Sequence, residues 1–261
     1  MFWTRVASSV VIAPLALGAV YLGYPIFHIF VALMAAAVIW EFVHIVSKAG
    51  FPPRAVLALW TAIAAIGIAP NNMGLSLTVL AAVWLILLAT DERGNRARLS
   101  STQTALLYAG LPAVCLVSVR EMGGAETVFW VLAVVWATDI GAYFVGRLIG
   151  GPKLAPAISP GKTWSGAVGG SIAAVLAGVA LATALGFAPT VLSIALAFIV
   201  SVVSQVGDLA ESRFKRVHGV KDSGTWMPGH GGVMDRVDGL WAATPAAALI
   251  CAALGGGVAA W

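Results

Sequence analysis

Long apolar runs follow one another through nearly the whole sequence and constrain its fold more than any other feature. A helix that crosses a membrane needs about 20 mostly apolar residues, with some tolerance for tilted or shorter helices. Nine runs meet this requirement, at residues 7–22, 26–46, 55–70, 73–90, 103–119, 125–148, 164–186, 188–207 and 233–258. The sequence therefore predicts an all-α, polytopic transmembrane protein with about nine spans.

The low charge content supports a membrane location. Only 10% of the residues are charged and 60% are hydrophobic, and the mean hydropathy is +0.95. Soluble proteins carry about 25% charged residues, and a soluble domain of this length could not bury so much apolar surface. The basic pI near 9.3 could indicate nucleic acid. In a membrane protein, however, excess Lys and Arg first reflects topology and attraction to anionic headgroups, so we expect no nucleic-acid partner.

The basic residues are distributed asymmetrically about the nine predicted spans. Fourteen of the 15 Lys and Arg residues fall on the same side as the amino terminus, and only Arg120 falls on the other. A missed span would scatter the later charges over both sides. The positive-inside rule then predicts a cytoplasmic amino terminus and two long cytoplasmic connections, at about 149–163 and 208–232.

Several acids lie within or at the ends of the apolar spans. An ionised acid in hydrocarbon costs on the order of 3 kcal/mol unless it faces protein, water or a cation, so each acid is a functional candidate. For Glu41 the favoured interpretation is a side chain that snorkels to the nearby interface. Asp139 shares a helix face with Tyr143 and Arg147, which leaves open a structural Asp–Arg pair or a functional role.

Two further acids, Asp235 and Asp238, are three residues apart at the start of the last span. This spacing makes them neighbours on one face of a helix. Two carboxylates so placed repel each other unless a cation lies between them, and a divalent metal is the simplest explanation. The pair is therefore predicted to bind metal.

The segment 207–238 combines acids, five basic residues and a glycine-rich turn, Pro228-Gly-His-Gly-Gly232, before the last span. Glycines let the backbone approach a phosphate closely, and the amino terminus of a helix points free N–H groups at it. Acids for a metal and bases for anions, side by side at a membrane surface, suit phosphoryl or nucleotidyl transfer to a lipid.

This segment also carries a family resemblance. In order, it contains Ser212, Lys215-Arg216, Lys221-Asp222, Pro228-Gly229-His230-Gly231-Gly232 and Asp235-Arg236-Val237-Asp238. The pattern resembles the signature of the phosphatidate cytidylyltransferases, also called CDP-diacylglycerol synthases. A second similar stretch runs from Asp139 to Ser159-Pro160-Gly161-Lys162-Thr163, with Gly161 standing where relatives often carry Lys. The specific resemblance covers about 100 residues, 139–238.

The resemblance implies an enzyme of phospholipid biosynthesis that converts CTP and phosphatidate to CDP-diacylglycerol and pyrophosphate. It implies Mg²⁺ as cofactor, with a second cation left open, and an active site at the cytoplasmic face of a bacterial inner membrane. We accordingly divide the chain into amino-terminal transmembrane helices at 1–120 and a catalytic transmembrane region at 121–261. The expected partners are CTP, phosphatidate and the lipid bilayer.

Individual roles follow from the resemblance together with the repulsion between acids. The predicted metal ligands are Asp208, Asp235 and Asp238. The other predicted catalytic residues are Lys215, Arg216, Lys221, Asp222, His230 and Arg236. The predicted substrate-binding residues are Asp139, Ser159, Lys162, Thr163 and Ser212. For His230, donation to a phosphate and a simple turn role both stay open.

Two alternatives concern function and assembly. A proton- or cation-coupled transporter could use Asp139, Asp208 and Asp235 as a relay, although the inverted repeats and broken helices common in transporters are absent from the sequence. Gly166 and Gly170 form a G-x-x-x-G pair that lets helices approach closely. This pair predicts either an internal helix contact or a homodimer.

Overall fold

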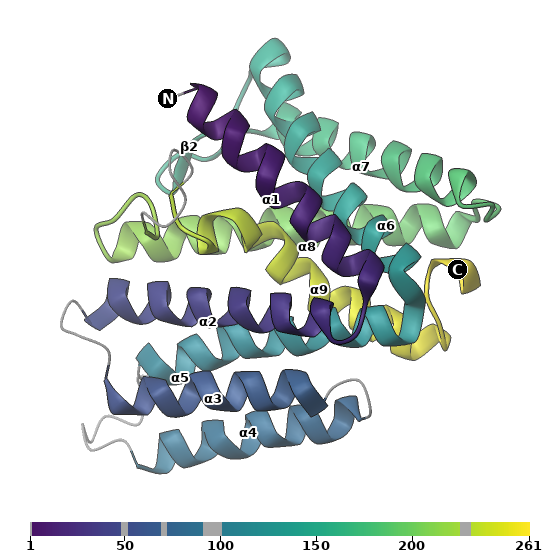
Figure 1. Ribbon diagram of the computed structural model, residues 1–261. Helices are drawn as coiled ribbons and strands as arrows, with labels where there is room; N and C mark the ends of the chain where they lie inside the picture. The colour runs from purple at the N-terminus through teal and green to yellow at the C-terminus, as the bar shows by residue number, and fades with distance from the viewer. Residues whose placement is uncertain (1, 48–51, 69–71, 91–100, 225–230) are drawn as a thin grey trace. The chain divides into compact units, whose positions relative to one another are not determined.

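The computed structural model describes residues 2–47, 52–68, 72–90, 101–224 and 231–261, and these are mostly helical (Figure 1). The α-helices are α1 (Phe2–Leu22), α2 (Ile26–Ser47), α3 (Pro53–Ile68), α4 (Met73–Ala89), α5 (Ser101–Ala105), α6 (Leu111–Ile149), α7 (Trp164–Ala184), α8 (Val191–Val217) and α9 (Met234–Leu254). A π-helix, η1 (Leu106–Gly110), joins α5 to α6, and a short 3-10 helix, η2 (Val258–Ala260), follows α9.

Several of these helices have the length and composition of membrane spans. Among the described residues, five helical stretches qualify: Ile26–Ser47, Ser101–Ile149, Trp164–Ala184, Val191–Val217 and Met234–Leu254. Shorter apolar helices cover Ile12–Leu22, Pro53–Ile68 and Met73–Ala89. The long stretch Ser101–Ile149 includes two of the predicted spans, and Gly124 between them has a non-helical backbone (φ 76°, ψ 175°). The all-α membrane protein predicted from the sequence agrees with this architecture.

The chain forms two compact units. The first contains Met1–Ser118 and Asp222–Arg236, and the second contains Val119–Lys221 and Val237–Trp261. Helices α6 and α9 each begin in the first unit and continue in the second. The described residues 222–224 and 231–236 of the signature segment thus belong to the same unit as the amino-terminal helices, although they are far from those helices in sequence.

Close helix packing builds the first unit. Helix α2 contacts α1, α3 and α5, and α3 also contacts α4. Helices α2, α3 and α4 are seen at the lower left of Figure 1. The buried face of α3 carries Ala55, Ala58, Ala62 and Ala65. Their spacing of three and four residues places them on one helix face, and their small side chains let the neighbouring helices approach closely. This packing surrounds α2, which contributes Glu41 to the site described below.

The G-x-x-x-G pair forms an internal contact of the second unit. A Cβ added at Gly166 would lie 2.7 Å from the carbonyl oxygen of Ala142, and one added at Gly170 would lie 2.7 Å from that of Thr138. Only glycine at these positions lets α7 pack this closely on α6. Of the two predictions for this motif, the internal helix contact is confirmed, so the motif does not itself indicate a homodimer.

The predicted connection at 149–163 contains a short hairpin that the all-α prediction did not include. Strand β1 (Lys153–Ala155) pairs antiparallel with β2 (Ser159–Thr163), with Lys153 opposite Thr163 and Ala155 opposite Ser159. Thr163 ends the hairpin and caps α7, because its hydroxyl accepts the amide N–H of Gly166 at 3.1 Å. Thr163 thereby joins the hairpin, which carries the predicted substrate-binding residues Ser159 and Lys162, directly to the start of α7.

Candidate active site

Three acids of the second unit come together where α8 and α9 meet. Asp208 and Glu211 lie three residues apart on α8, and Asp238 lies on α9; one oxygen from each carboxylate falls within 4.8 Å of the others. The helices can approach here because α8 carries Gly207, where an added Cβ would lie 3.0 Å from the carbonyl oxygen of Asp238. Carboxylates this close repel each other unless positive charge compensates them.

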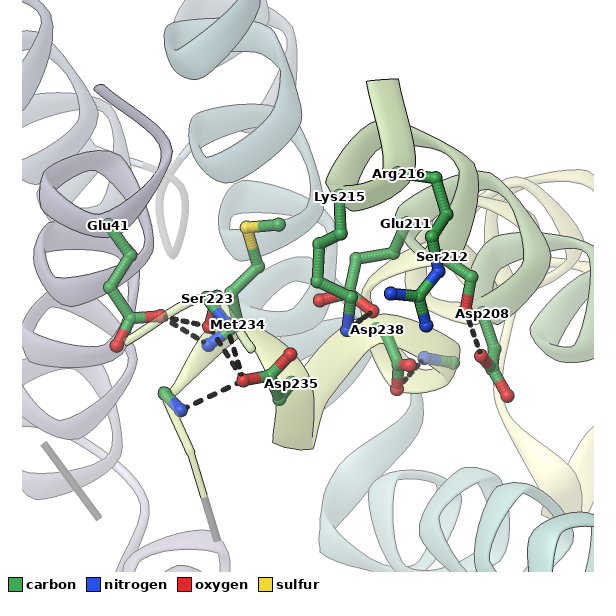
Figure 2. A network of polar contacts seen from close by, with 12 residues as sticks. Glu41, Asp208, Glu211, Ser212, Lys215, Arg216, Ser223, Met234, Asp235 and Asp238 are labelled. Carbon is green, nitrogen blue, oxygen red and sulfur yellow. Dashed lines mark hydrogen bonds and ion pairs between the residues drawn. The ribbon is translucent and has the colours of Figure 1, made fainter. Parts of the chain in front are cut away.

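Two lysines supply that positive charge. The Nζ of Lys162, on β2, forms an ion pair with Oδ2 of Asp208. The Nζ of Lys215 lies 3.0 Å from Oε2 of Glu211, whose side chain is fully buried. Ser212 donates to Oδ1 of Asp208 at 3.4 Å (Figure 2). The second unit therefore contains a cluster of three acids and two lysines, which we call the acid–lysine group: Asp208, Glu211, Asp238, Lys162 and Lys215.

The donor set of the acid–lysine group suits a metal ion. Carboxylate oxygens are the ligands that hard divalent cations prefer, and three converging acids could hold one. Asp208 and Asp238 were predicted as ligands from the sequence, whereas Glu211 was not. A signal for Glu211 does exist in its spacing, three residues after Asp208 and four before Lys215 on the same helix. That spacing also predicts an ordinary i,i+4 ion pair, which the structure contains as well.

A second group of polar contacts lies in the first unit and is centred on Glu41 of α2. Its Oε1 accepts the amide N–H of Val233 at 2.8 Å, and its Oε2 accepts that of Met234 at 2.9 Å. The hydroxyl of Ser223 lies 2.8 Å from the same Oε2 (Figure 2). Glu41 is only 2% exposed. The interpretation that its carboxylate snorkels to the membrane surface is therefore wrong, because the carboxylate accepts hydrogen bonds from the buried residues Ser223, Val233 and Met234.

Asp235 is bound within the same unit. Its Oδ2 accepts the amide N–H of Ser223 at 2.8 Å and that of Gly232 at 2.9 Å, and it lies 3.0 Å from the Ser223 hydroxyl (Figure 2). Ser223 thus contacts both Glu41 and Asp235. We call Glu41, Ser223, Asp235 and the amides of residues 232–234 the Glu41 network.

The glycine-rich turn has a local role in the Glu41 network. A Cβ added at Gly232 would overlap the Ser223 hydroxyl and both carboxylate oxygens of Glu41. Gly231 has a φ of 85°, in the left-handed region that favours glycine, and an added Cβ would lie 2.6 Å from Oδ2 of Asp235. The sequence suggested that these glycines admit a phosphate. In the structure, both glycines make room for the two acids, and the approach of a phosphate stays a prediction.

The remaining residues of the predicted site have varied surroundings. On α6, Arg147 donates to the hydroxyl of Tyr143 at 2.9 Å, along the helix face that also carries Asp139. Arg216 donates from Nε to the carbonyl oxygen of Ile158 at 3.3 Å and so links α8 to the hairpin. The hydroxyl of Thr163 is engaged in capping α7. Substrate contacts for these side chains stay predictions.

Other predicted residues are more open. Ser159 is half-buried at the start of β2, and Lys221, Asp222 and Arg236 are exposed. His230 lies outside the residues that the structure describes. Sequence reasoning assigned no role to Glu211 or Ser223 and undervalued Glu41. The signal for Glu41 was its position as an acid in the otherwise apolar run 29–43, but nothing nearby in the sequence identified its partners.

The sequence of the chain is similar to that of one protein family and of several bacterial proteins. A family model described as the cytidylyltransferase family matches residues 3–254. A phosphatidate cytidylyltransferase of Brucella suis is 42% identical over 246 residues, covering 92% of this chain and 89% of the relative. One from Pseudomonas aeruginosa is 35% identical over 272 residues, covering 98% of this chain and 99% of the relative. One from Bacillus subtilis is 42% identical over 137 residues, about half of each chain.

Proposed function

The chain belongs to the cytidylyltransferase family, and we propose that it transfers the cytidylyl group of CTP to phosphatidate, forming CDP-diacylglycerol and pyrophosphate. The observation that carries this proposal is the acid–lysine group, which combines three carboxylates with two lysines in one place. Acids and bases arranged in this way suit the transfer of one phosphate-bearing group to another.

The reaction does not need a strong general base. The phosphate of phosphatidate is already an anion at neutral pH, so its oxygen can attack the α-phosphorus of CTP directly. The bond from that phosphorus to the bridging oxygen breaks, and pyrophosphate leaves with the electron pair. The difficulty lies in bringing one anion up to another. Lys162, Lys215 and Arg216 answer it by neutralising phosphate oxygens, and the other catalytic and substrate-binding residues predicted from the sequence keep their proposed roles around the lipid phosphate and the triphosphate.

We propose Mg²⁺ as the metal, with a second cation left open. Asp208, Glu211 and Asp238 fit it by donor type and by the convergence of their oxygens. Asp235, predicted as a ligand from the sequence, is kept as a further proposed ligand. When bound, the ion would act as a Lewis acid on phosphate oxygens. Lys162 and Lys215 neutralise the acids in this structure. In the complex with metal and substrates, they neutralise phosphate oxygens instead.

The membrane arrangement forms part of the same proposal. We propose nine spans, a cytoplasmic amino terminus, and an active site at the cytoplasmic face of a bacterial inner membrane, with catalysis assigned to residues 121–261. The asymmetry of the basic residues supports this arrangement. Single cysteines placed at Asn95 and Val220 should resist an impermeant thiol reagent added to intact cells. Labelling of either from outside would contradict the topology.

A direct assay tests the reaction. The purified full chain in detergent, given CTP, phosphatidate and Mg²⁺, should release pyrophosphate and form CDP-diacylglycerol in equal amounts. Release should require phosphatidate and should stop without CTP. Absence of both products, or pyrophosphate release that ignores phosphatidate, would refute the proposal. The alternative of a proton- or cation-coupled transporter receives no support from the relatives named above.

A further inference from the structure

We propose that Glu41 and Ser223 are positioning residues: they hold the first turn of α9 and thereby set the orientation of Asp235. The inference deepens the proposed function and rests on it in one respect, namely that Asp235 belongs to the catalytic centre. It concerns a residue of α2, which lies outside the segment 139–238 that carries the specific family resemblance.

The first step is the cap that Glu41 provides. The first N–H groups of any α-helix have no acceptor within that helix. At the start of α9 these groups include the amides of Val233 and Met234, and each donates to a different oxygen of Glu41, at 2.8 and 2.9 Å. A carboxylate in this position also interacts favourably with the helix dipole. Glu41 therefore acts as an N-cap supplied by a helix nearly 200 residues away in sequence.

The second step is the link through Ser223. Its hydroxyl lies 2.8 Å from Oε2 of Glu41 and 3.0 Å from Oδ2 of Asp235, and its amide donates to the same Oδ2 at 2.8 Å. The amide of Gly232 donates there as well, at 2.9 Å. The Asp235 carboxylate cannot rotate away without losing these donors together. Its orientation is thus tied to Glu41 through the backbone of 232–234 and through Ser223.

The third step is burial, which makes the Glu41 network sensitive to the loss of any hydrogen-bond acceptor. Glu41 is 2% exposed, Ser223 5% and Met234 0%. Because water cannot reach these atoms, a donor that loses its acceptor stays unsatisfied. Glutamine at position 41 would offer one acceptor oxygen and would turn an NH₂ group toward a backbone N–H. Glu41→Gln therefore disrupts the cap while keeping the size of the side chain.

The experiment compares Glu41→Gln with Val43→Ala, a matched control. Val43 is fully buried on the same helix and belongs to neither polar group, so its truncation loosens α2 without touching the cap. Hydrogen exchange of the full chain in detergent is the first readout. In Glu41→Gln, peptides covering 231–236 should exchange at least about tenfold faster, with α8 unchanged. In Val43→Ala, exchange at 231–236 should match the wild type.

Kinetics provide the second readout. Glu41→Gln should lower kcat at least about tenfold, leave KM for CTP within about twofold, and raise the Mg²⁺ concentration that gives half-maximal activity. Val43→Ala should change none of these, even if its thermal stability falls as far. Ser223→Ala keeps both backbone bonds to Glu41, so it should fold even if Glu41→Gln does not. It should alter Mg²⁺ dependence and kcat in the same direction, with a smaller change in exchange.

Three results would overturn the inference. They are unchanged exchange at 231–236 in Glu41→Gln, faster exchange with normal kcat, and equal kcat losses in Glu41→Gln and Val43→Ala. Failure of the proposed function would look different, since the wild type would then form no CDP-diacylglycerol. In that case the exchange readout alone decides whether Glu41 holds the start of α9.

Discussion

The acid–lysine group and the Glu41 network use the same chemical group, the carboxylate, with different partners. In the second unit, Asp208 and Glu211 pair with the side chains of Lys162 and Lys215. In the first unit, Glu41 and Asp235 accept mainly from backbone amides. A lysine ammonium on a flexible stem can exchange its partner readily, whereas a backbone amide is held by the fold. The partner thus separates acids whose charge is neutralised by mobile lysine side chains from acids whose carboxylates are held in place by the backbone.

Exposure differs in the same direction for the Lys162–Asp208 pair, although Glu211 is as buried as Glu41. The side chains of Lys162 and Asp208 are 27% and 29% exposed, whereas Glu41 is 2% exposed. An ion pair that reaches solvent contributes little to stability and can be replaced by a ligand at low cost. A buried carboxylate with several donors is costly to disturb. Substitutions in the two units should therefore affect activity and stability in different proportions.

The largest effect is expected from Asp238→Asn. This change keeps the size of the side chain but removes one of the three converging charges, so CDP-diacylglycerol formation should fall by about 10³-fold or demand far more Mg²⁺. The measurement is initial rate against Mg²⁺ concentration. Glu121→Gln, an exposed acid of α6, serves as the control and should behave like the wild type. Normal rates with ordinary Mg²⁺ dependence in Asp238→Asn would remove this acid from the site.

Asp235→Asn should come next, with a loss of at least about 10²-fold. The amide can still accept a hydrogen bond at one oxygen, so the fold should survive, but the proposed ligand charge is gone. Rates across a Mg²⁺ series, together with thermal stability in detergent, separate the two contributions. If turnover and metal dependence stay normal, Asp235 belongs to the structural network alone, and the contrast between the units becomes sharper.

Gly232→Ala should act mainly on stability. Its Cβ would overlap the Ser223 hydroxyl and the Glu41 carboxylate, so the free energy of unfolding should fall by about 1–3 kcal/mol. Thermal unfolding in detergent measures this loss. Gly161→Ala is the matched control, because an added Cβ there meets no atom within 4 Å. Equal stabilities of the two variants would show that the Glu41 network tolerates the added volume.

The smallest of these effects is expected from Lys162→Ala. Because this ion pair reaches solvent, the variant should fold normally while turnover falls about tenfold, equivalent to about 1.4 kcal/mol of transition-state stabilisation. Lys153→Ala, an exposed lysine of the same hairpin, should keep the wild-type rate. Full activity in Lys162→Ala would exclude its ammonium from the reaction, and loss of folded protein would make the ion pair structural.

The sequence by itself determined the class of the protein and four of the five members of the acid–lysine group, all except Glu211. Apolar runs predict membrane helices because the cost of placing residues in lipid is a local sum over about 20 positions. The resemblance to a known family, together with the repulsion between acids, likewise identified Asp208, Lys215 and Asp238. Helical periodicity reveals which residues share a face, so features built within one helix could be predicted.

Tertiary structure decided the partners. The donors to Glu41 lie 182 to 193 residues further along the chain, and no local pattern encodes a bond over that separation. The same holds for Gly166 and Gly170, whose spacing predicts a close contact but does not say with which helix, and for Glu211, whose spacing fits an ion pair and a metal ligand equally well. Periodicity fixes a direction around one helix, whereas the group met in that direction depends on how all the helices pack.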